Sequence, residues 1–183
     1  MRVSSGSSAG DLRLWCYLPG AGPSHSHFDE VLQGRRFAVG ADVAMGTGAS
    51  NSAIAVADAD TGEKIAEYYS PDIEPKKLAR LCVALCKLFN NAMLIWDSSG
   101  STGKSFSKEV VDEIKYTKLY YRQSEGKIRK RLRDAPGRFL NTDDRAVLLK
   151  DYRSFLELRE FINRSEIAMR ETLQFVVRPG GMI

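Results

Sequence analysis

Residues 37–56 read FAVGADVAMGTGASNSAIAV, and this stretch decides the fold because it places two strand patterns on either side of a short loop. The first is the apolar run Phe37–Ala44 (FAVGADVA), which contains one acid, Asp42. Met45–Asn51 is a loop of glycine, serine, threonine and asparagine, and Ser52–Asp58 (SAIAVAD) reads as a second strand. The pattern therefore predicts two neighbouring strands with Asp42 inside the first.

The sequence after this pair predicts a third strand and then a change to helical periodicity. Asp60-Thr61-Gly62 has the composition of a hairpin turn into a strand at Lys64–Tyr69, which makes an antiparallel meander. Over Glu74–Phe89 apolar residues recur with the spacing of an amphipathic helix. Ala92–Trp96 (AMLIW) is fully apolar, as expected for a strand in a sheet covered on both faces, and Asp97 follows it directly.

The remaining residues add a fifth strand and three more helices. A helix is expected after Ser98–Gly103, ending near Ile114, and Lys118–Arg122 is expected as the fifth strand. Two further helices are predicted over residues 143–158 and 165–177. The order βββ-α-β-α-β-α-α predicts an α/β fold whose mixed five-stranded sheet has three antiparallel strands followed by two parallel ones, flanked by helices.

The ends and composition of the chain bound its class. We expect residues 1–36 to be an N-terminal preamble or linker, and residues 37–183 to form one domain. The chain has 183 residues, of which 43% are hydrophobic, enough for a sizeable core. Its longest apolar runs have five residues, far short of the ~20 that a membrane helix needs, and no secretory signal follows Arg2. We therefore expect a cytoplasmic protein without a membrane partner.

Positive charge is concentrated in the second half of the chain. Residues 1–90 hold 9 Lys and Arg against 10 Asp and Glu, whereas residues 91–183 hold 18 against 13. The densest run is Lys127–Arg133 (KIRKRLR), which could lie along DNA phosphates or could be an ordinary solvated surface. The candidate DNA-binding residues are Arg122, Lys127, Arg129, Lys130, Arg131, Arg133 and Arg138.

Two acids, Asp42 and Asp97, stand out by their positions on the predicted strands. If the crossover helix places the strand before Asp97 beside the strand that holds Asp42, the two carboxylates face each other at the middle of the sheet. Neighbouring carboxylates repel and persist at low cost only when a divalent cation neutralises them. Magnesium or manganese suits such oxygen ligands, and two ions about 3.5–4 Å apart can activate water for phosphodiester cleavage. On spacing alone, the alternative that Asp97 caps a turn or helix stays open.

The opening stretch also carries a family resemblance. FAVGADVAMGTGASNSAIAV is similar to the first motif of the nuclease domain of tailed-phage terminase large subunits, with Asp42 at the position of that family's first metal-binding acid. The similarity extends over about residues 37–183. It continues through Asp60–Glu63, Asn90–Asp97, Pro136–Leu149 and Glu171–Gly181.

This resemblance implies a ribonuclease H-like fold and a metal-dependent endonuclease that cleaves double-stranded viral DNA during genome packaging. Asp42 and Asp97 would be the catalytic acids and would hold two magnesium or manganese ions. The implied partners are double-stranded DNA and, in a full-length protein, an ATPase domain, a small terminase subunit and a portal. The implied location is the cytoplasm of a bacterial host, with the gene carried by a phage or prophage.

The sequence departs from the family pattern at two acidic positions. The family usually has glutamate where this chain has Asp97. Its third acid follows a Pro/Gly turn like Pro179-Gly180-Gly181, and no residue here can be assigned to that role. We therefore expect a nuclease domain truncated before its last acidic motif, and a catalytically incomplete module that docks DNA or the portal is the alternative.

A nucleotide-binding loop is a further alternative. Ser98–Ser105 (SSGSTGKS) follows an apolar strand and opens a helix, which is the context of a phosphate-binding P-loop. The first glycine of that motif is replaced by Ser98, and no downstream strand ends in an acid suited to the nucleotide's magnesium ion.

Overall fold

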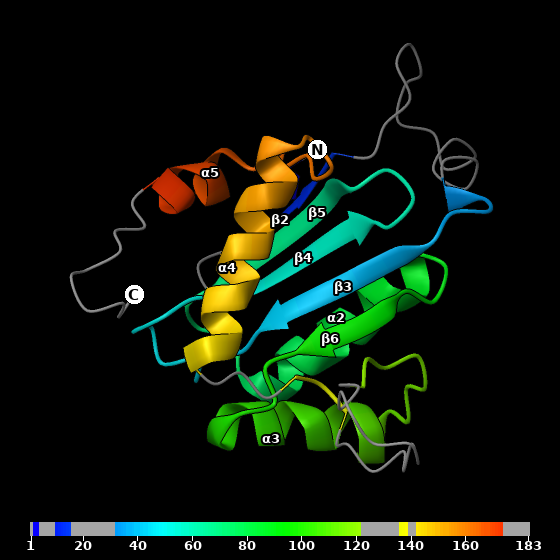
Figure 1. The fold of residues 1–183 in the computed structure, drawn as a ribbon. Coiled ribbons are helices and arrows are strands. Elements are labelled where there is room, and N and C mark those ends of the chain that lie inside the picture. The colour runs from blue at the N-terminus through cyan, green and yellow to red at the C-terminus, as the bar shows by residue number, and fades with distance from the viewer. Residues whose placement is uncertain (1, 4–9, 16–31, 122–135, 139–141, 174–183) are drawn as a thin grey trace, which may run out of the picture.

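A six-stranded mixed sheet forms the centre of the computed structural model, which describes residues 2–3, 10–15, 32–121, 136–138 and 142–173 (Figure 1). Its strand order is β1-β2-β5-β4-β3-β6. The strands are β1 (Arg2–Val3), β2 (Asp11–Leu14), β3 (Phe37–Asp42), β4 (Ser52–Asp58), β5 (Glu63–Ser70) and β6 (Met93–Trp96).

The register of the sheet confirms the predicted meander and crossover. β3 pairs antiparallel with β4, placing Val39 opposite Val56, and β4 pairs antiparallel with β5. Helix α2 (Pro75–Leu88) then returns the chain so that β6 lies parallel to β3, with Ala41 opposite Trp96. Asp42 ends β3 and Asp97 follows β6, so the two acids lie side by side at the C-terminal ends of two neighbouring parallel strands.

Two parts of the sheet differ from the sequence prediction. Within the expected preamble, β2 pairs antiparallel with β5, where Leu14 lies opposite Ala66, so this segment extends the sheet. Over the described part of the expected fifth strand, Lys118–Arg122, the pairing is reduced to two isolated parallel bridges, Leu94 with Leu119 and Tyr121 with Gly137. The last residue of the expected strand, Arg122, lies outside the described residues.

The main core lies between the sheet and the two helices α2 and α3 (Gly100–Lys108). Helix α3 continues as the π-helical turn η1 (Glu109–Glu113). The residues of α2 that face the sheet are fully buried, including Leu78, Cys82 and Cys86. Phe106 of α3 packs against Trp96 with ring centroids 5.3 Å apart. Burial of each such large apolar side chain contributes about 1.5–3 kcal/mol to folding.

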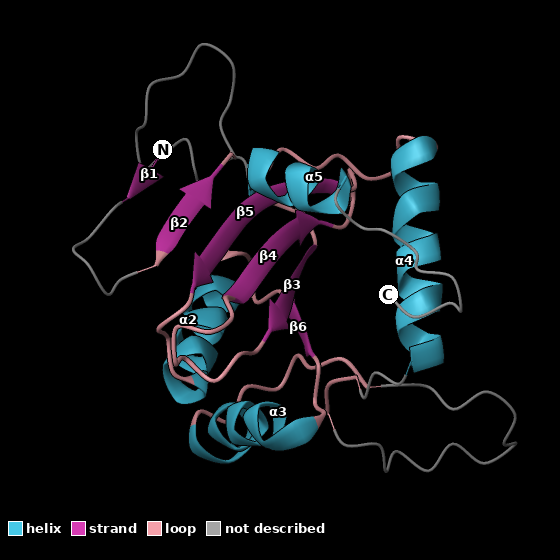
Figure 2. Cartoon of the chain, turned by 90° about the vertical axis from the view of Figure 1, so that its left-hand side faces the viewer, coloured by secondary structure: helices cyan, strands magenta, loops and turns pink. Residues whose placement is uncertain are grey.

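Helices α4 (Thr142–Glu157) and α5 (Glu166–Leu173) lie on the opposite face of the sheet from α2 (Figure 2). Both begin within one residue of their predicted starts. Several large apolar side chains of α4 remain exposed, among them Val147 and Phe155. Among the described helices, none has the length and apolar content needed to cross a membrane.

Candidate functional site

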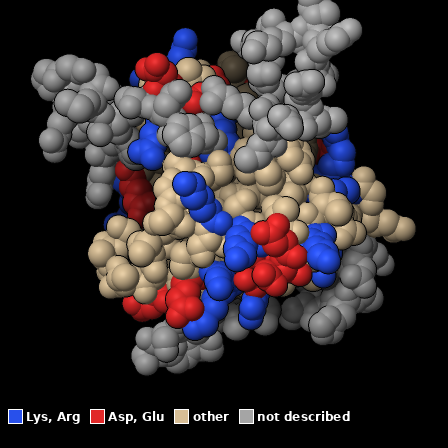
Figure 3. All heavy atoms as spheres, turned by 90° about the horizontal axis from the view of Figure 1, so that it is seen from below, with Lys and Arg blue, Asp and Glu red and all other residues tan. Residues whose placement is uncertain are grey.

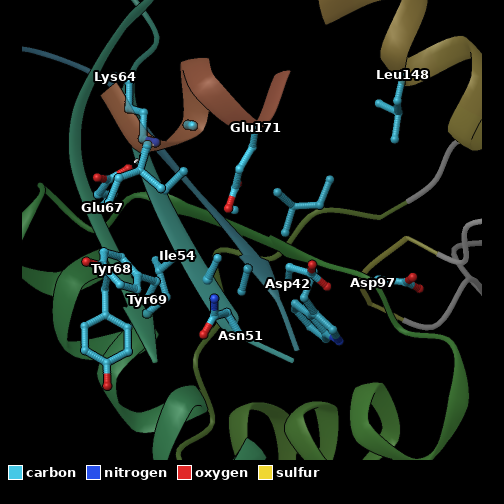
Figure 4. Close-up of a pocket in the computed structure, with 18 of the residues that line it drawn as sticks. Asp42, Asn51, Ile54, Lys64, Glu67, Tyr68, Tyr69, Asp97, Leu148 and Glu171 are labelled. Atoms are coloured by element: carbon cyan, nitrogen blue, oxygen red, sulfur yellow. Dashed lines mark hydrogen bonds and ion pairs between the residues drawn. The ribbon is translucent and has the colours of Figure 1, made fainter. Parts of the chain in front are cut away.

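A cavity of about 780 Å³ lies between the sheet and helices α4 and α5 (Figure 4). Strands β3, β4, β5 and β6 form its floor, while α4 contributes Arg145 and Leu148 and α5 contributes Ile167, Ala168 and Glu171. The cavity exists because small residues occupy the facing positions of the central strands, including Gly40, Ala53 and Ala55. The neighbouring strand residues Ile54 and Val56 are buried in the sheet.

Asp42 and Asp97, which were expected to face each other on neighbouring strands, both line one end of this cavity. The pKa of Asp42 is raised above its ordinary value, first because the surrounding protein removes water and second because Asp97 is negatively charged. A hydrogen bond from the backbone N–H of Val43 and the positive charge of Arg145 act in the opposite direction. The repulsion shows that the sheet holds these two acids close enough to interact.

The two carboxylate oxygens of Asp97 have different surroundings. Oδ1 accepts hydrogen bonds from the backbone N–H of Ser99 at 2.9 Å and from the Ser99 hydroxyl at 2.5 Å. Oδ2 lies 3.7 Å from a guanidinium nitrogen of Arg145. Asp97 therefore does stabilise the turn that precedes α3, as the alternative interpretation expected, and still directs its second oxygen toward a cation at the cavity.

Arg138 is fixed beside Asp97 by backbone hydrogen bonds. Its N–H donates to the carbonyl of Trp96 at 2.8 Å, and its carbonyl accepts from Ser98 at 3.0 Å. Its guanidinium lies 3.7 Å from Asp144 at the start of α4. The Nε of Arg138 is buried without a hydrogen-bond partner among the described residues, which leaves a donor available to an anion in the cavity.

A buried ion pair forms the other end of the cavity. Lys64 donates to Glu67 at 2.6 Å, and the hydroxyl of Ser165 donates to the second oxygen of Glu67 at 2.9 Å. Val56 pairs with Ala66 but Ala57 pairs with Lys64, so β5 has a bulge with one extra residue between Lys64 and Ala66. This bulge places Lys64 and Glu67 on one face of β5, although a regular strand would point them in opposite directions. Because Ser165 also accepts the N–H of Ala168 at 3.1 Å, this cluster fixes the start of α5.

Glu171, which the sequence analysis did not single out, projects from α5 into the same cavity (Figure 4). Its helical position was predictable, but nothing local in the sequence shows that α5 lies over the sheet. Within the described ranges, no group of three or more His, Cys, Asp or Glu side chains is arranged to hold a metal ion. Asp42 and Asp97 are thus the candidate ligands in this part of the chain.

The chemistry of this acid pair fits a hydrated divalent cation. Both donors are carboxylate oxygens, the ligands that magnesium and manganese prefer, and the cavity leaves room for coordinating water. Burial and, after it, repulsion from Asp97 raise the pKa of Asp42, and a bound cation would offset that repulsion.

Most of the predicted DNA-binding residues cannot be placed. Arg122, Lys127, Arg129, Lys130, Arg131 and Arg133 lie outside the described residues, whereas Arg138 lines the cavity. On the face around α3, the visible described surface mixes basic and acidic side chains and shows no continuous basic patch (Figure 3).

The structure argues against the P-loop alternative. Only Asp97, Ser98 and Ser99 separate β6 from α3, so Gly103 and Lys104 already belong to the helix. Gly103 packs on this turn so closely that an added Cβ would lie 2.4 Å from the carbonyl oxygen of Asp97. The segment is therefore too short and too tightly packed to wrap a phosphate, because a P-loop needs a longer loop before its lysine.

Solved structures with the same arrangement identify the fold. The large terminase nuclease from thermophilic phage G20c with bound magnesium matches with a TM-score of 0.57 and 14% sequence identity, over 76% of this chain and 64% of that chain. The fold is that of a phage large-terminase nuclease. The zinc-bound G20c nuclease matches equally well by TM-score, 0.57, at 16% identity and over 78% of this chain and 72% of that one.

The large terminase nuclease domain of Thermus phage P74-26 matches with a TM-score of 0.54 and 13% identity, over 75% of this chain and 60% of that chain. These matches confirm the predicted ribonuclease H-like fold with its mixed, helix-flanked sheet. The chain spans just under two thirds of the magnesium-bound nuclease. No protein-family model matches the sequence, and no curated protein matches it.

Proposed function

We propose that this chain is a divalent-metal-dependent endonuclease domain that cleaves double-stranded DNA during phage genome packaging. The observation that carries the proposal is the pair Asp42 and Asp97, which share one end of a cavity in a large-terminase nuclease fold. The magnesium and zinc in the similar G20c structures support the use of divalent ions. The wider setting that we propose is a motor with an ATPase domain, a small terminase subunit and a portal, working in a bacterial host's cytoplasm.

The residues of the cavity divide the work between them. Asp42 and Asp97 would hold magnesium or manganese, which when bound supplies Lewis-acid activation of water and of the phosphodiester. Ser99 fixes the orientation of Asp97 by two hydrogen bonds to one oxygen, which leaves the other oxygen to face the cavity. Arg138, whose Nε has no hydrogen-bond partner within the described part of the chain, would contact a backbone phosphate, and the basic residues predicted over 122–133 would add further phosphate contacts.

Plasmid nicking in the presence of manganese tests this proposal. We expect Asp42→Asn and Asp97→Asn to reduce the nicking rate by at least about 100-fold, since an amide cannot supply the charge that an ion requires. Asp112→Asn is the matched control, because Asp112 is an exposed acid of η1 that does not line the cavity. Manganese-dependent nicking that persists in Asp42→Asn contradicts the proposal.

A catalytically incomplete docking module is the second candidate function. The finding that favours it is the lack of a three-carboxylate or mixed metal-binding group among the described residues. This candidate predicts salt-dependent binding to double-stranded DNA without any manganese binding that depends on Asp42. Electron paramagnetic resonance of free manganese, titrated with wild type and Asp42→Asn, distinguishes the two functions even where nicking is slow.

A further inference from the structure

We propose that Arg145 is an exchangeable cation of this site, pairing with Asp97 in the free protein and with the scissile phosphate when metal and DNA are bound. This inference rests on the proposed function and deepens it, because it assigns a substrate-contacting residue that the sequence analysis did not single out. The geometry points to Arg145 through its partner, its exposure and its position on α4.

The contact with Asp97 is one that a metal ion would displace. The Arg145 guanidinium lies 3.7 Å from Oδ2 of Asp97, the oxygen that Ser99 leaves free. The Arg145 side chain is 62% exposed and that of Asp97 is 19% exposed, so the arginine can leave while the carboxylate stays in place. Ion pairs with so exposed a partner are weak, and a divalent ion competes for the same oxygen.

Arg145 differs in this respect from the other two cations that line the cavity. Lys64 is buried and donates to Glu67 at 2.6 Å, so its charge is already committed. Arg138 is fixed through its backbone to Trp96 and Ser98 and is less exposed, with 22% of its side chain accessible. Only Arg145, among the cavity-lining residues that the structure describes, combines direct contact with a candidate metal ligand and freedom to move.

The position of Arg145 on its helix also requires an explanation beyond local stability. It lies in the first turn of α4, directly after Asp143 and Asp144. The helix dipole favours acids there and disfavours a cation. Two ion pairs, Arg138 with Asp144 and Arg145 with Asp97, hold this first turn against the edge of the sheet where the acids lie.

The chemistry that Arg145 would supply is charge stabilisation without proton transfer. A phosphate oxygen bound at the acid pair would lie next to Asp97 and therefore within reach of a guanidinium that starts 3.7 Å from that carboxylate. Arginine donates two parallel hydrogen bonds to phosphate oxygens, and these strengthen as negative charge develops in the transition state. Hydrolysis of the phosphodiester consumes one water, and Arg145 neither gains nor loses a proton.

The first part of the test measures manganese binding without DNA. Since Arg145 competes with the ion for Asp97, we expect Arg145→Ala to bind manganese about 3–10-fold more tightly than wild type. Arg145→Lys keeps the charge and is expected to lie closer to wild type. Arg153→Ala is the matched control, because Arg153 is an exposed arginine of the same helix that pairs with Glu157 at 2.8 Å and does not line the cavity.

The second part measures single-turnover nicking at saturating manganese. We expect Arg145→Ala to be slower by about 10–100-fold despite its tighter metal binding, with partial recovery in Arg145→Lys. In the Asp42→Asn background, which under the proposed function binds DNA with little cleavage, we expect Arg145→Ala to lower the salt dependence of DNA binding by about one counterion.

Tighter manganese binding together with slower nicking supports the inference, because a merely structural role would weaken both. Where wild type shows Asp42-dependent manganese binding, any other combination in Arg145→Ala overturns the inference and leaves the proposed function standing. If Asp42→Asn binds manganese as wild type does, the proposed metal site is wrong and the role of Arg145 falls with it.

Discussion

The two faces of the sheet carry opposite kinds of side chain. Toward α2 and α3, the strands present large apolar residues such as Val39 and Trp96, which are almost completely buried. Toward α4 and α5, the same strands present Gly40, Ala53 and Asp42, and the space above them stays open. The same alternation along each strand therefore builds a core on one side and a site on the other.

The residues that stabilise the fold and the residues that could do chemistry therefore lie on different faces of the sheet. The core face excludes water and fixes the strands, whereas the cavity face tolerates two interacting acids and several charged residues. Repelling charges at such a site cost stability in exchange for function, so neutralising an acid of the pair should stabilise the protein, whereas truncating a core side chain should destabilise it.

The largest effect is expected from Phe106→Ala on the core face. Phe106 is fully buried and packs on Trp96, so its removal leaves a cavity and should destabilise the protein by about 3–5 kcal/mol. Urea denaturation measures this loss. A change below about 1 kcal/mol would show that α3 is not part of the cooperative core.

A smaller effect is expected from Ser165→Ala at the far end of the cavity. The Ser165 hydroxyl donates to Glu67 and accepts from Ala168, so the variant leaves a buried carboxylate oxygen with one donor fewer and α5 without its cap. We expect a loss of about 1–3 kcal/mol in urea denaturation. Ser107→Ala is the control, since Ser107 is a half-buried serine of α3 that lies outside the cluster of Lys64, Glu67 and Ser165; equal losses in the two variants would contradict an anchoring role.

The opposite sign is expected for Asp42→Asn in the absence of metal. The pKa of Asp42 is raised in the folded state, so the ionised group opposes folding as the pH rises above its ordinary range near 3.8. At pH 7 the variant should therefore have a Tm about 1–3 °C above that of wild type. The difference should shrink as the pH falls through the folded pKa of Asp42, because wild type then becomes neutral at this position.

Manganese should reverse this order of stabilities. Under the proposed function it binds only the folded wild-type site, so the wild-type Tm should rise with its concentration while that of Asp42→Asn stays constant. Differential scanning calorimetry with and without manganese measures both changes. Equal shifts in the two proteins would mean that the ion binds elsewhere.

The smallest effect is expected from Gly40→Ala on the cavity floor. An added Cβ would meet only Ile95, at 3.9 Å, and Gly40 lies in a regular strand. The variant should be neutral or more stable by up to about 1 kcal/mol, because alanine has less backbone entropy to lose. A strongly destabilised Gly40→Ala protein would show that the floor is packed as tightly as the core.

Local sequence patterns were sufficient to predict the part of the site that belongs to the strands. Residues 37–58 gave the first two strands, and the apolar run before Asp97 gave the parallel neighbour of β3, so the acid pair followed from strand order. The roles of Arg145 and Glu171 depend on where two helices lie over the sheet. Periodicity predicts such helices but does not orient them.

Two further features escaped prediction for different physical reasons. β2 is a four-residue strand of alternating polar and apolar residues, DLRL, whose stability comes from pairing with β5 and not from its own composition. The Lys64–Glu67 pair depends on a bulge, and one extra residue in a strand changes which side chains share a face.

The hydrogen-bonded pairing of β3 with β6 sets the spacing of the acid pair. The last paired residues are Ala41 and Trp96, and Asp42 and Asp97 follow them directly. The distance between the backbones of the two acids is therefore set by the spacing between neighbouring strands. Arg145, in contrast, belongs to α4, and the first turn of this helix contacts the site through the ion pairs Arg138–Asp144 and Arg145–Asp97. The acid pair is thereby preformed in the sheet, so a different segment in place of α4 would change the cations around it while the spacing of the two acids stayed the same.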